Sequence, residues 1–148
     1  MKINIWIGVM LAATLAACSG AHAPADTPAD EKAIAAQMHA TWDRPDSPLD
    51  VGPIVVHENY AIAGWTQGPM GGRALLKREH DSWNTILCAG DGIRSADGLA
   101  AVGMPMDDAS ALSRKLIAAE KSVSAERLAR MAEFRGIVRM EGGKHKTH

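Results

Sequence analysis

The stretch YAIAGWTQGPMGGRALLKREHDSWNTILCAGDG, residues 60–92, decides the fold. Its apolar residues alternate or run in short groups between turn-forming residues, a pattern typical of antiparallel strands. Gly68-Pro69-Met70-Gly71-Gly72 has the composition of a tight turn, because proline fixes φ and glycine accepts positive φ. Glu79-His80-Asp81-Ser82 is a second, polar turn. The stretch therefore predicts a β-meander with strands at Tyr60–Trp65, Arg73–Lys77 and Trp83–Cys88.

The flanking sequence adds helices and a further strand. Apolar residues at helical spacing within Asp30–Trp42 predict an N-terminal helix, which ends before Pro45 because a residue preceding proline disfavours the α conformation. An extended connector over 46–53 leads to a first short strand at Ile54–His57. After Gly92, serine, aspartate and glycine at the boundaries of apolar segments predict three helices. These helices span 96–102, 107–121 and 125–134, and an edge strand or strap follows at 137–140.

These elements predict an α+β fold. An N-terminal helix precedes an antiparallel β-meander of about four strands, and the C-terminal helices pack on one sheet face, an arrangement that is cystatin-like or NTF2-like by analogy. The pairing predicted for the two hairpins sets Trp65 opposite Ala74 and Ala74 opposite Leu87. One face then carries Ala61, Ala63, Trp65, Ala74, Leu76, Trp83 and Leu87 and is expected to form the core, while Arg73 and Cys88 lie on the other. A slip of one residue reverses the two faces.

The N-terminus has the features of a bacterial lipoprotein signal. Lys2 precedes an apolar run of about a dozen residues, the length of a signal-peptide core and short for a membrane span. The run ends in Leu15-Ala16-Ala17-Cys18, which resembles the lipobox and implies cleavage before Cys18 and lipidation of that cysteine. The alternative is an ordinary secretory signal with an incidental cysteine. Ser19 after the cysteine favours the outer membrane over the inner one.

The predicted organisation is therefore a lipoprotein signal peptide at 1–17, a flexible Ala/Pro-rich tether at 18–29, one α+β domain at 30–140 and a mobile polar tail at 141–148. The protein is expected on the periplasmic side of the envelope, held to the membrane by its lipid. Its net charge is −1 and no basic stripe is present, so a nucleic-acid partner is not indicated.

Cys88 is the one cysteine that remains free when Cys18 is lipidated. It is interpreted as a buried small residue, a metal ligand or a site of intermolecular disulfide formation. A nucleophilic thiol needs a base within reach, and the candidates are His57 and His80. His80 lies in a turn at the far end of the hairpin, about 20 Å from Cys88 at the rise of a strand. No catalytic residue is assigned, and the chain is not expected to be an enzyme.

Soft side chains make copper the metal to consider. Thiol and thioether groups suit Cu(I), and imidazole suits copper generally. The candidate ligands are Cys88, Met104 and Met106 in one loop, and His145 and His148 in the polar tail. Methionine more often fills gaps in a core, and terminal histidines are often solvated, so both alternatives stay open. Gly71-Gly72-Arg73 is interpreted as hairpin geometry, and Asp91 as a cap of backbone N–H groups.

Several motifs resemble those of the small exported proteobacterial proteins called copper uptake system-associated proteins. The similarity covers nearly all of the domain. It lies in Tyr60–Gln67-Gly68, Gly71–Leu76, Trp83, Leu87-Cys88-x-Gly90-Asp91, Val102-Gly103-Met104-Pro105 and Phe134-x-Gly136-x-Val138-x-Met140. The resemblance implies that the protein functions together with a periplasmic copper chaperone or an outer-membrane copper receptor. It does not provide an assigned set of metal ligands.

The function expected from the sequence is that of a lipid-anchored periplasmic accessory protein for copper uptake, which acts by partner contacts or transient copper binding. The alternative is an envelope scaffold or interaction lipoprotein without metal, which contacts its partners through an exposed sheet face.

Overall fold

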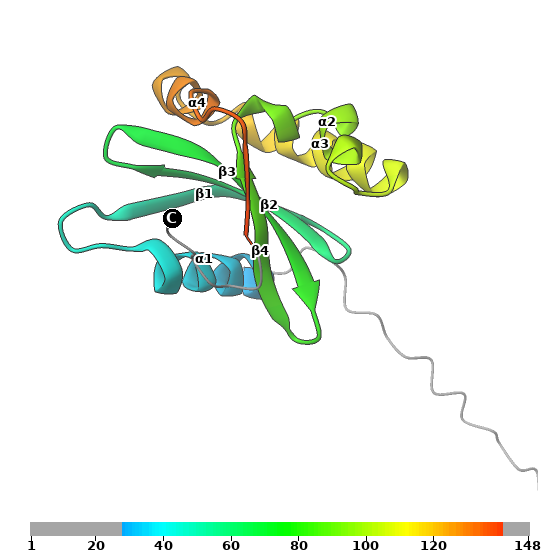
Figure 1. Cartoon of the computed structure of the whole chain (residues 1–148), viewed down its shortest axis with the longest axis horizontal. Helices are drawn as coiled ribbons and strands as arrows, with labels where there is room; N and C mark the ends of the chain where they lie inside the picture. The colour runs from blue at the N-terminus through cyan, green and yellow to red at the C-terminus, as the bar shows by residue number, and fades with distance from the viewer. Residues whose placement is uncertain (1–27, 141–148) are drawn as a thin grey trace, which may run out of the picture.

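The computed structural model describes residues 28–140, in which one antiparallel sheet carries helices on both faces (Figure 1). The sheet is a meander, because its five strands lie side by side in the order in which they occur in the chain. They are β1 (Leu49–His57), β2 (Tyr60–Gln67), β3 (Met70–Glu79), β4 (Ser82–Ala89) and β5 (Ile137–Arg139). The predicted α+β class and meander are confirmed.

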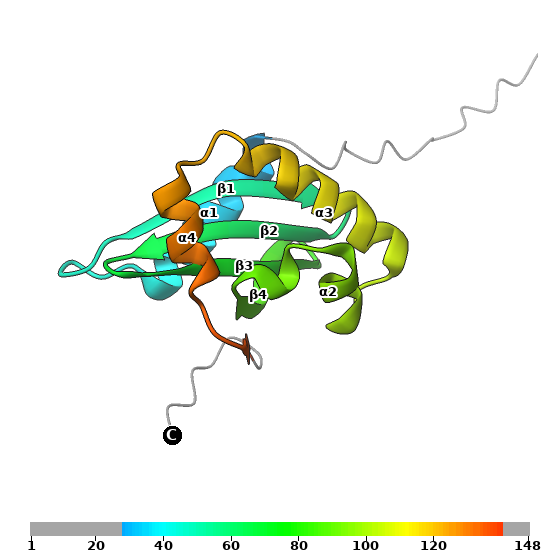
Figure 2. The same cartoon turned by 90° about the horizontal axis from the view of Figure 1, so that it is seen from above.

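Helices cover the sheet from opposite sides. Helix α1 (Pro28–Trp42) lies on one face, and α2 (Ala96–Ala101), α3 (Met106–Glu120) and α4 (Ala125–Ala132) lie on the other, preceded by the short 3-10 helix η1 (Asp91–Ile93). Figure 2 shows α3 and α4 lying over the strands. The predicted caps of α2 and α4 are confirmed: Ser95 accepts a hydrogen bond from the Gly98 N–H, and Ser124 accepts one from the Arg127 N–H.

Several boundaries differ from the predictions: α1 begins at Pro28 instead of Asp30, and β3 begins at Met70, within the predicted turn. Helix α3 begins at Met106 after Pro105, so Asp107 and Asp108 lie in its first turn, where negative charge is favourable, instead of capping it. Strand β1 begins at Leu49, although residues up to Pro53 were expected to be a connector. Its pairing with β2 shifts between Val51 and Ile54. A bulge accommodates proline, which has no N–H for the ladder.

The sheet has a hydrophobic core on each face. The core beneath α1 contains Ile34, Met38, Leu49, Val56, Ala61, Ala63, Trp65, Ala74, Leu76, Trp83 and Cys88. The core beneath α2 and α3 contains Val55, Ile62, Leu75, Leu87, Ala89, Ile93, Leu99, Met104, Ala109, Leu112 and Leu116. The expectation of one exposed sheet face is therefore wrong within the described residues, because helices bury both.

The register explains which side chains share a face. In the β2–β3 hairpin, Trp65 pairs with Gly72 and Ala63 with Ala74. This is a shift of two residues from the predicted pairing, so the predicted faces of these strands are correct. The pairing of β3 with β4 changes register between Leu75 and Leu76, opposite Leu87 and Thr85. The extra residue at this bulge moves Cys88 to the α1 face and Leu87 to the α3 face, and it reverses both predicted positions.

A buried ion network joins β3 to α3. The Arg73 side chain is 1% exposed, and its Nε lies 2.6 Å from Glu120 Oε1. The second Glu120 oxygen binds Arg94 Nε at 2.6 Å, and Arg73 Nη1 binds Asp91 Oδ1 at 2.9 Å. Asp91 therefore pairs with an arginine, whereas it was expected to cap backbone N–H groups. Arg73 holds α3 against the sheet, a role beyond the hairpin geometry predicted for it.

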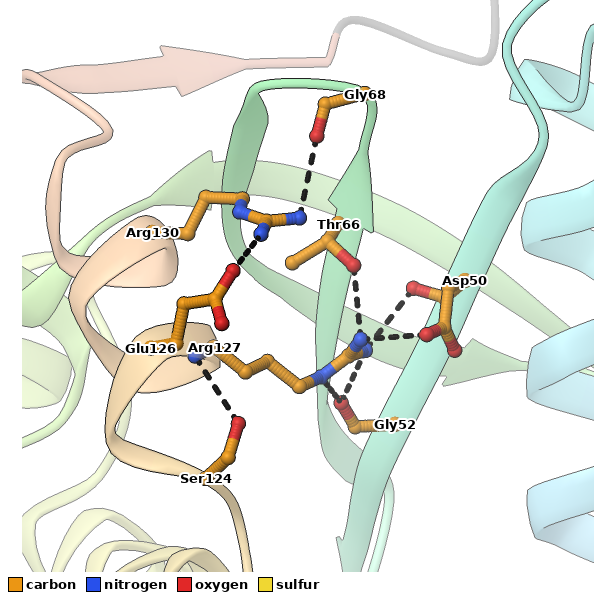
Figure 3. A network of polar contacts seen from close by, with 8 residues as sticks. All are labelled: Asp50, Gly52, Thr66, Gly68, Ser124, Glu126, Arg127 and Arg130. Atoms are coloured by element: carbon orange, nitrogen blue, oxygen red, sulfur yellow. Dashed lines mark hydrogen bonds and ion pairs between the residues drawn. The ribbon is translucent and has the colours of Figure 1, made fainter.

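Helix α4 is attached to the sheet by Arg127 (Figure 3). Its guanidinium donates to the Gly52 carbonyl, to the Thr66 hydroxyl and to the carboxylate and carbonyl of Asp50. These acceptors belong to the bulged part of β1 and the end of β2. Arg127 thus satisfies carbonyl groups that the irregular pairing leaves available, and it places α4 and the following chain near the end of the sheet.

Candidate functional site

The candidate site is a cavity of about 250 Å³ on the α1 face of the sheet. We call it the sulfur-lined cavity, because a thiol and three thioethers contribute to its wall. Its lining residues are Met38, Trp42, Arg44, Leu49, Trp65, Gln67, Met70, Cys88, Phe134, Val138 and Met140. They come from the end of α1, from all five strands or their flanks, and from the chain after α4.

The four sulfur-bearing residues lie at different depths. Met38 of α1 is 1% exposed and Cys88 of β4 is 6% exposed, so both belong to the deep part of the cavity. Met70, the first residue of β3, is 58% exposed and reaches the cavity from the surface. Met140 follows β5 and is half-buried, and its N–H donates to the Ile86 carbonyl at 2.9 Å. The sulfur-bearing side chains therefore extend from the surface to the floor.

The thiol of Cys88 lies in an apolar environment. Burial raises the pKa of Cys88 to about 12, because an apolar environment disfavours the thiolate, and the Trp65 side chain opposes this only in part. A thiol with this pKa is protonated at neutral pH and is a poor nucleophile. It becomes a thiolate only when a partner, such as a metal ion, compensates the charge.

Trp65 brings a polar group to the wall of this cavity. The residue is 8% exposed, and in the described part of the chain its indole Nε1 has no partner at full hydrogen-bonding geometry, although the Trp65 side chain is close enough to Cys88 to lower the pKa of that thiol. A buried N–H without a partner costs free energy, so such a group calls for an explanation. Trp65 lines the cavity together with Cys88, and the group that its side chain affects is the Cys88 thiol.

The cavity wall is held in place by close packing. The Trp65 and Phe134 rings meet edge to face, with centroids 5.9 Å apart. A Cβ added to Gly90 lies 2.5 Å from the Phe134 carbonyl oxygen, so glycine is required for the chain after α4 to approach β4. On the other side, the Gln67 amide donates to the Trp42 and Ser47 carbonyls, both at 2.8 Å, and fixes the segment after α1.

The structure does not bring all of the predicted ligands together. Cys88 and Met104 belong to cores on opposite faces of the sheet, and Met106 is exposed at the start of α3. Met104 and Met106 therefore do not share a site with Cys88. Cys18, His145 and His148 lie outside residues 28–140, as do the predicted signal peptide, most of the predicted tether and the tail. Among the described residues, no group of three His, Cys, Asp or Glu side chains is placed to hold a metal ion.

The sequence analysis missed Met38 and Met140 as neighbours of Cys88. Met38 was interpreted as part of the apolar stripe of the first helix, which it is, and Met140 as part of a strap. Their only signal in the sequence is that methionine carries sulfur. Their proximity depends on the bulge in β4 and on the pairing of Cys88 with Val138, two residues before Met140.

The register also separates Cys88 from the candidate bases. His57, Tyr60, Lys77 and Asn84 form one row across four strands. Cys88 lies four residues further along β4, so about 20 Å separates it from His57. His57 instead lies with its Nε2 3.3 Å from Asp108 Oδ1 of α3. The described structure therefore contains no Cys88–histidine pair at hydrogen-bonding distance.

Comparisons of the chain with models of protein families, with curated proteins and with solved structures find no match. Within residues 28–140, the helices are too short or too polar to cross a membrane. The functional proposal therefore depends on the sulfur-lined cavity and on the residues of the chain itself.

Proposed function

We propose that the protein is a lipid-anchored periplasmic accessory protein for copper uptake, and that it binds Cu(I) transiently in the sulfur-lined cavity. The observation that carries this proposal is the shared wall formed by one thiol and three thioethers. Thiolate and thioether sulfur are soft ligands, and such ligands select Cu(I) over the harder divalent ions.

The surroundings of Cys88 fit a monovalent ion. Because the cavity is mostly apolar, a bound ion whose charge is not compensated has a large desolvation cost. A Cys88 thiolate compensates a single positive charge, and the neutral thioethers of Met38, Met70 and Met140 add donors without adding charge. The Trp65 N–H then has the Cys88 sulfur as an acceptor. The side chains of Met38 and Met140 are flexible enough to adjust to an ion.

The same environment favours transient binding. Burial raises the pKa of Cys88 to about 12, so binding at neutral pH must displace a proton from the thiol. This requirement lowers the apparent affinity and makes release easier. Met70 is exposed at one edge of the cavity and provides a first ligand for an ion that arrives from a donor.

The location and partners in this proposal come from the sequence. The lipobox at Leu15–Cys18 supports a lipid anchor, and the segment before α1 supplies the tether. The resemblance to copper uptake system-associated proteins supports a periplasmic copper chaperone or an outer-membrane copper receptor as the partner. An interaction lipoprotein without metal is the alternative.

A competition assay separates these two functions. The mature protein is titrated against a chromogenic Cu(I) chelator under reducing, oxygen-free conditions. We expect competition at equimolar protein, a loss of at least about tenfold in affinity for Cys88→Ser, and smaller losses for Met38→Leu and Met140→Leu. The matched control is Met104→Leu, the same substitution in the core on the opposite sheet face, which is expected to leave the affinity unchanged. Absence of competition by the unsubstituted protein contradicts the proposal and supports the alternative.

A further inference from the structure

One side of the sulfur-lined cavity carries a positive charge. Arg44, in the segment between α1 and β1, is the one charged residue among the eleven described residues that line the cavity. Cys88 adds no charge at neutral pH, because burial raises the pKa of its thiol to about 12. The wall is therefore largely apolar with a single cationic group, which suits a ligand with an apolar body and one negative charge.

The Arg44 guanidinium is available to such a ligand. Among residues 28–140 it has no hydrogen-bond or ion-pair partner, and only the backbone N–H of this residue donates to a side chain. The arginines that join helices to the sheet differ, since Arg73 and Arg127 are held by carboxylates at 2.6 and 2.7 Å. The Arg44 side chain is exposed at the rim of the cavity, and its donors are left for the carboxylate of a ligand.

Hydrogen bonds fix the backbone of this segment at the rim. The Asp43 carboxylate accepts from the N–H groups of Arg44 and Leu49, at 3.1 and 2.8 Å. The Ser47 N–H donates to the Arg44 carbonyl at 3.1 Å, and the Gln67 amide of β2 donates to the Ser47 carbonyl. The acidic neighbour of Arg44 thus binds backbone groups, and the Arg44 side chain extends from a fixed position.

The apolar part of the cavity suits an aromatic ring. Trp42, Trp65 and Phe134 contribute rings to its wall, and the last two meet edge to face with centroids 5.9 Å apart. Aromatic rings gain free energy from edge-to-face and offset contacts with a further ring. The cavity volume of about 250 Å³ equals the volume of about eight molecules of liquid water, which is room for one ring and a short chain.

We propose that the sulfur-lined cavity binds a small arylalkyl carboxylate, with the ring of the ligand among Trp42, Trp65 and Phe134 and its carboxylate on the Arg44 guanidinium. Guanidinium and carboxylate groups form paired, charge-assisted hydrogen bonds, which fix the orientation of the ligand. This function goes beyond the proposed binding of Cu(I) and does not depend on it. Because both ligands contact the same wall, the cavity holds one or the other.

Methionine methyl NMR locates the ligand within the protein. The full mature chain, reduced and without metal, is titrated with 3-phenylpropionate as the probe. We expect saturable shifts of the Met38 and Met140 methyl signals, with a Kd on the order of 1 mM or below for a ligand of this size. Met104, in the core on the opposite sheet face, and the exposed Met106 are internal controls whose signals stay in place. Shifts that do not saturate, or equal shifts at Met106 and Met38, overturn the proposal.

An uncharged probe tests the role of the carboxylate. 3-Phenylpropionamide has the same ring and chain as 3-phenylpropionate but carries no negative charge. We expect it to shift the same methyl signals and to bind about fivefold more weakly, because it cannot form an ion pair with Arg44. Equal affinities of the two probes overturn the assignment of Arg44 as the anion-binding group.

Substitution of the arginine completes the test. Arg44→Gln is expected to weaken 3-phenylpropionate binding about fivefold and to leave 3-phenylpropionamide binding unchanged. Arg114→Gln is the matched control, because Arg114 is exposed on α3, on the opposite side of the sheet, and its loss changes the net charge equally. Equal effects of the two substitutions on 3-phenylpropionate overturn the proposal. Since copper is absent throughout, these titrations decide the carboxylate site independently of the chelator competition.

Discussion

The core beneath α3 and the core beneath α1 are built from alternate residues of the same strands, but they differ in the polar groups they contain and in the cavity that borders the second. Under α3, Leu99, Leu112 and Leu116 are fully buried, and the Arg73–Glu120 pair satisfies the charges that lie there. Under α1, one helix covers the sheet, and a cavity lined by the Cys88 thiol and the Trp65 indole lies at one end. The core on the α3 face therefore contributes to the stability of the fold. The core on the α1 face also contributes to stability, and it borders a cavity that is large enough for a ligand.

The largest effect is expected from breaking the charge pair on the α3 face. Glu120→Ala leaves the Arg73 guanidinium buried without its 2.6 Å partner. Loss of one partner of a buried ion pair costs about 3–5 kcal/mol. Urea unfolding monitored by tryptophan fluorescence measures this cost. Asp91→Ala is the control, because Asp91 is 61% exposed and its pair with Arg73 is worth less than about 1 kcal/mol. A loss below 1 kcal/mol for Glu120→Ala contradicts the role assigned to the pair.

The next effect concerns the Cys88 thiol on the α1 face and depends on pH. The pKa of Cys88 is raised from 9.0 to about 12, so above pH 9 the unfolded chain loses this proton while the folded chain keeps it. The stabilisation is fully present below pH 9 and is lost progressively toward pH 12. Relative to the non-titrating Cys88→Ala variant, the protein is expected to lose about 2–3 kcal/mol between pH 8 and pH 11. Chemical unfolding at the two pH values checks this, and a constant difference between the proteins contradicts the burial of the thiol.

A smaller effect is expected from moving the wall of the cavity. The Cβ of Gly90→Ala collides with the Phe134 carbonyl, so the chain between α4 and β5 must shift. Overpacking of this kind costs about 1–3 kcal/mol, and it is expected to weaken Cu(I) binding as well. Gly92→Ala is the matched control in the same segment, since its Cβ meets no atom within 4 Å. Thermal unfolding and the chelator competition measure both effects. Equal behaviour of the two variants contradicts the placement of Phe134 against β4.

The smallest effect on stability is expected at the mouth of the cavity. Met70→Leu changes an exposed side chain and is expected to alter the free energy of unfolding by less than about 0.5 kcal/mol. It removes the outermost thioether, so Cu(I) uptake in stopped-flow measurements is expected to slow. Met106→Leu serves as the control, because Met106 is similarly exposed but lies at the start of α3, on the opposite side of the sheet. Unchanged uptake by Met70→Leu shows that the ion enters by another route.

Much of the fold was predictable from local patterns, whereas the site was not. Alternation and turn residues in 60–92 predicted the meander, and the serine caps predicted where α2 and α4 begin. The bulge in β4 has no clear signal in the sequence, and one extra residue there decides which face receives Cys88. Cys88 and Met104, both predicted as candidate metal ligands, lie on opposite faces of the sheet for that reason. The cavity depends on contacts between α1, β4 and the chain after α4, which spacing along the sequence does not reveal.

The central claim is that sulfur atoms of the α1-face cavity hold Cu(I). X-ray absorption at the copper edge, on the mature protein loaded with one equivalent of Cu(I), tests it directly by identifying the atoms bound to the ion. We predict sulfur in the first coordination shell, with one sulfur fewer in Cys88→Ser and an unchanged shell in Met104→Leu. A first shell that contains only nitrogen and oxygen, or one that Cys88→Ser leaves unchanged, contradicts the account.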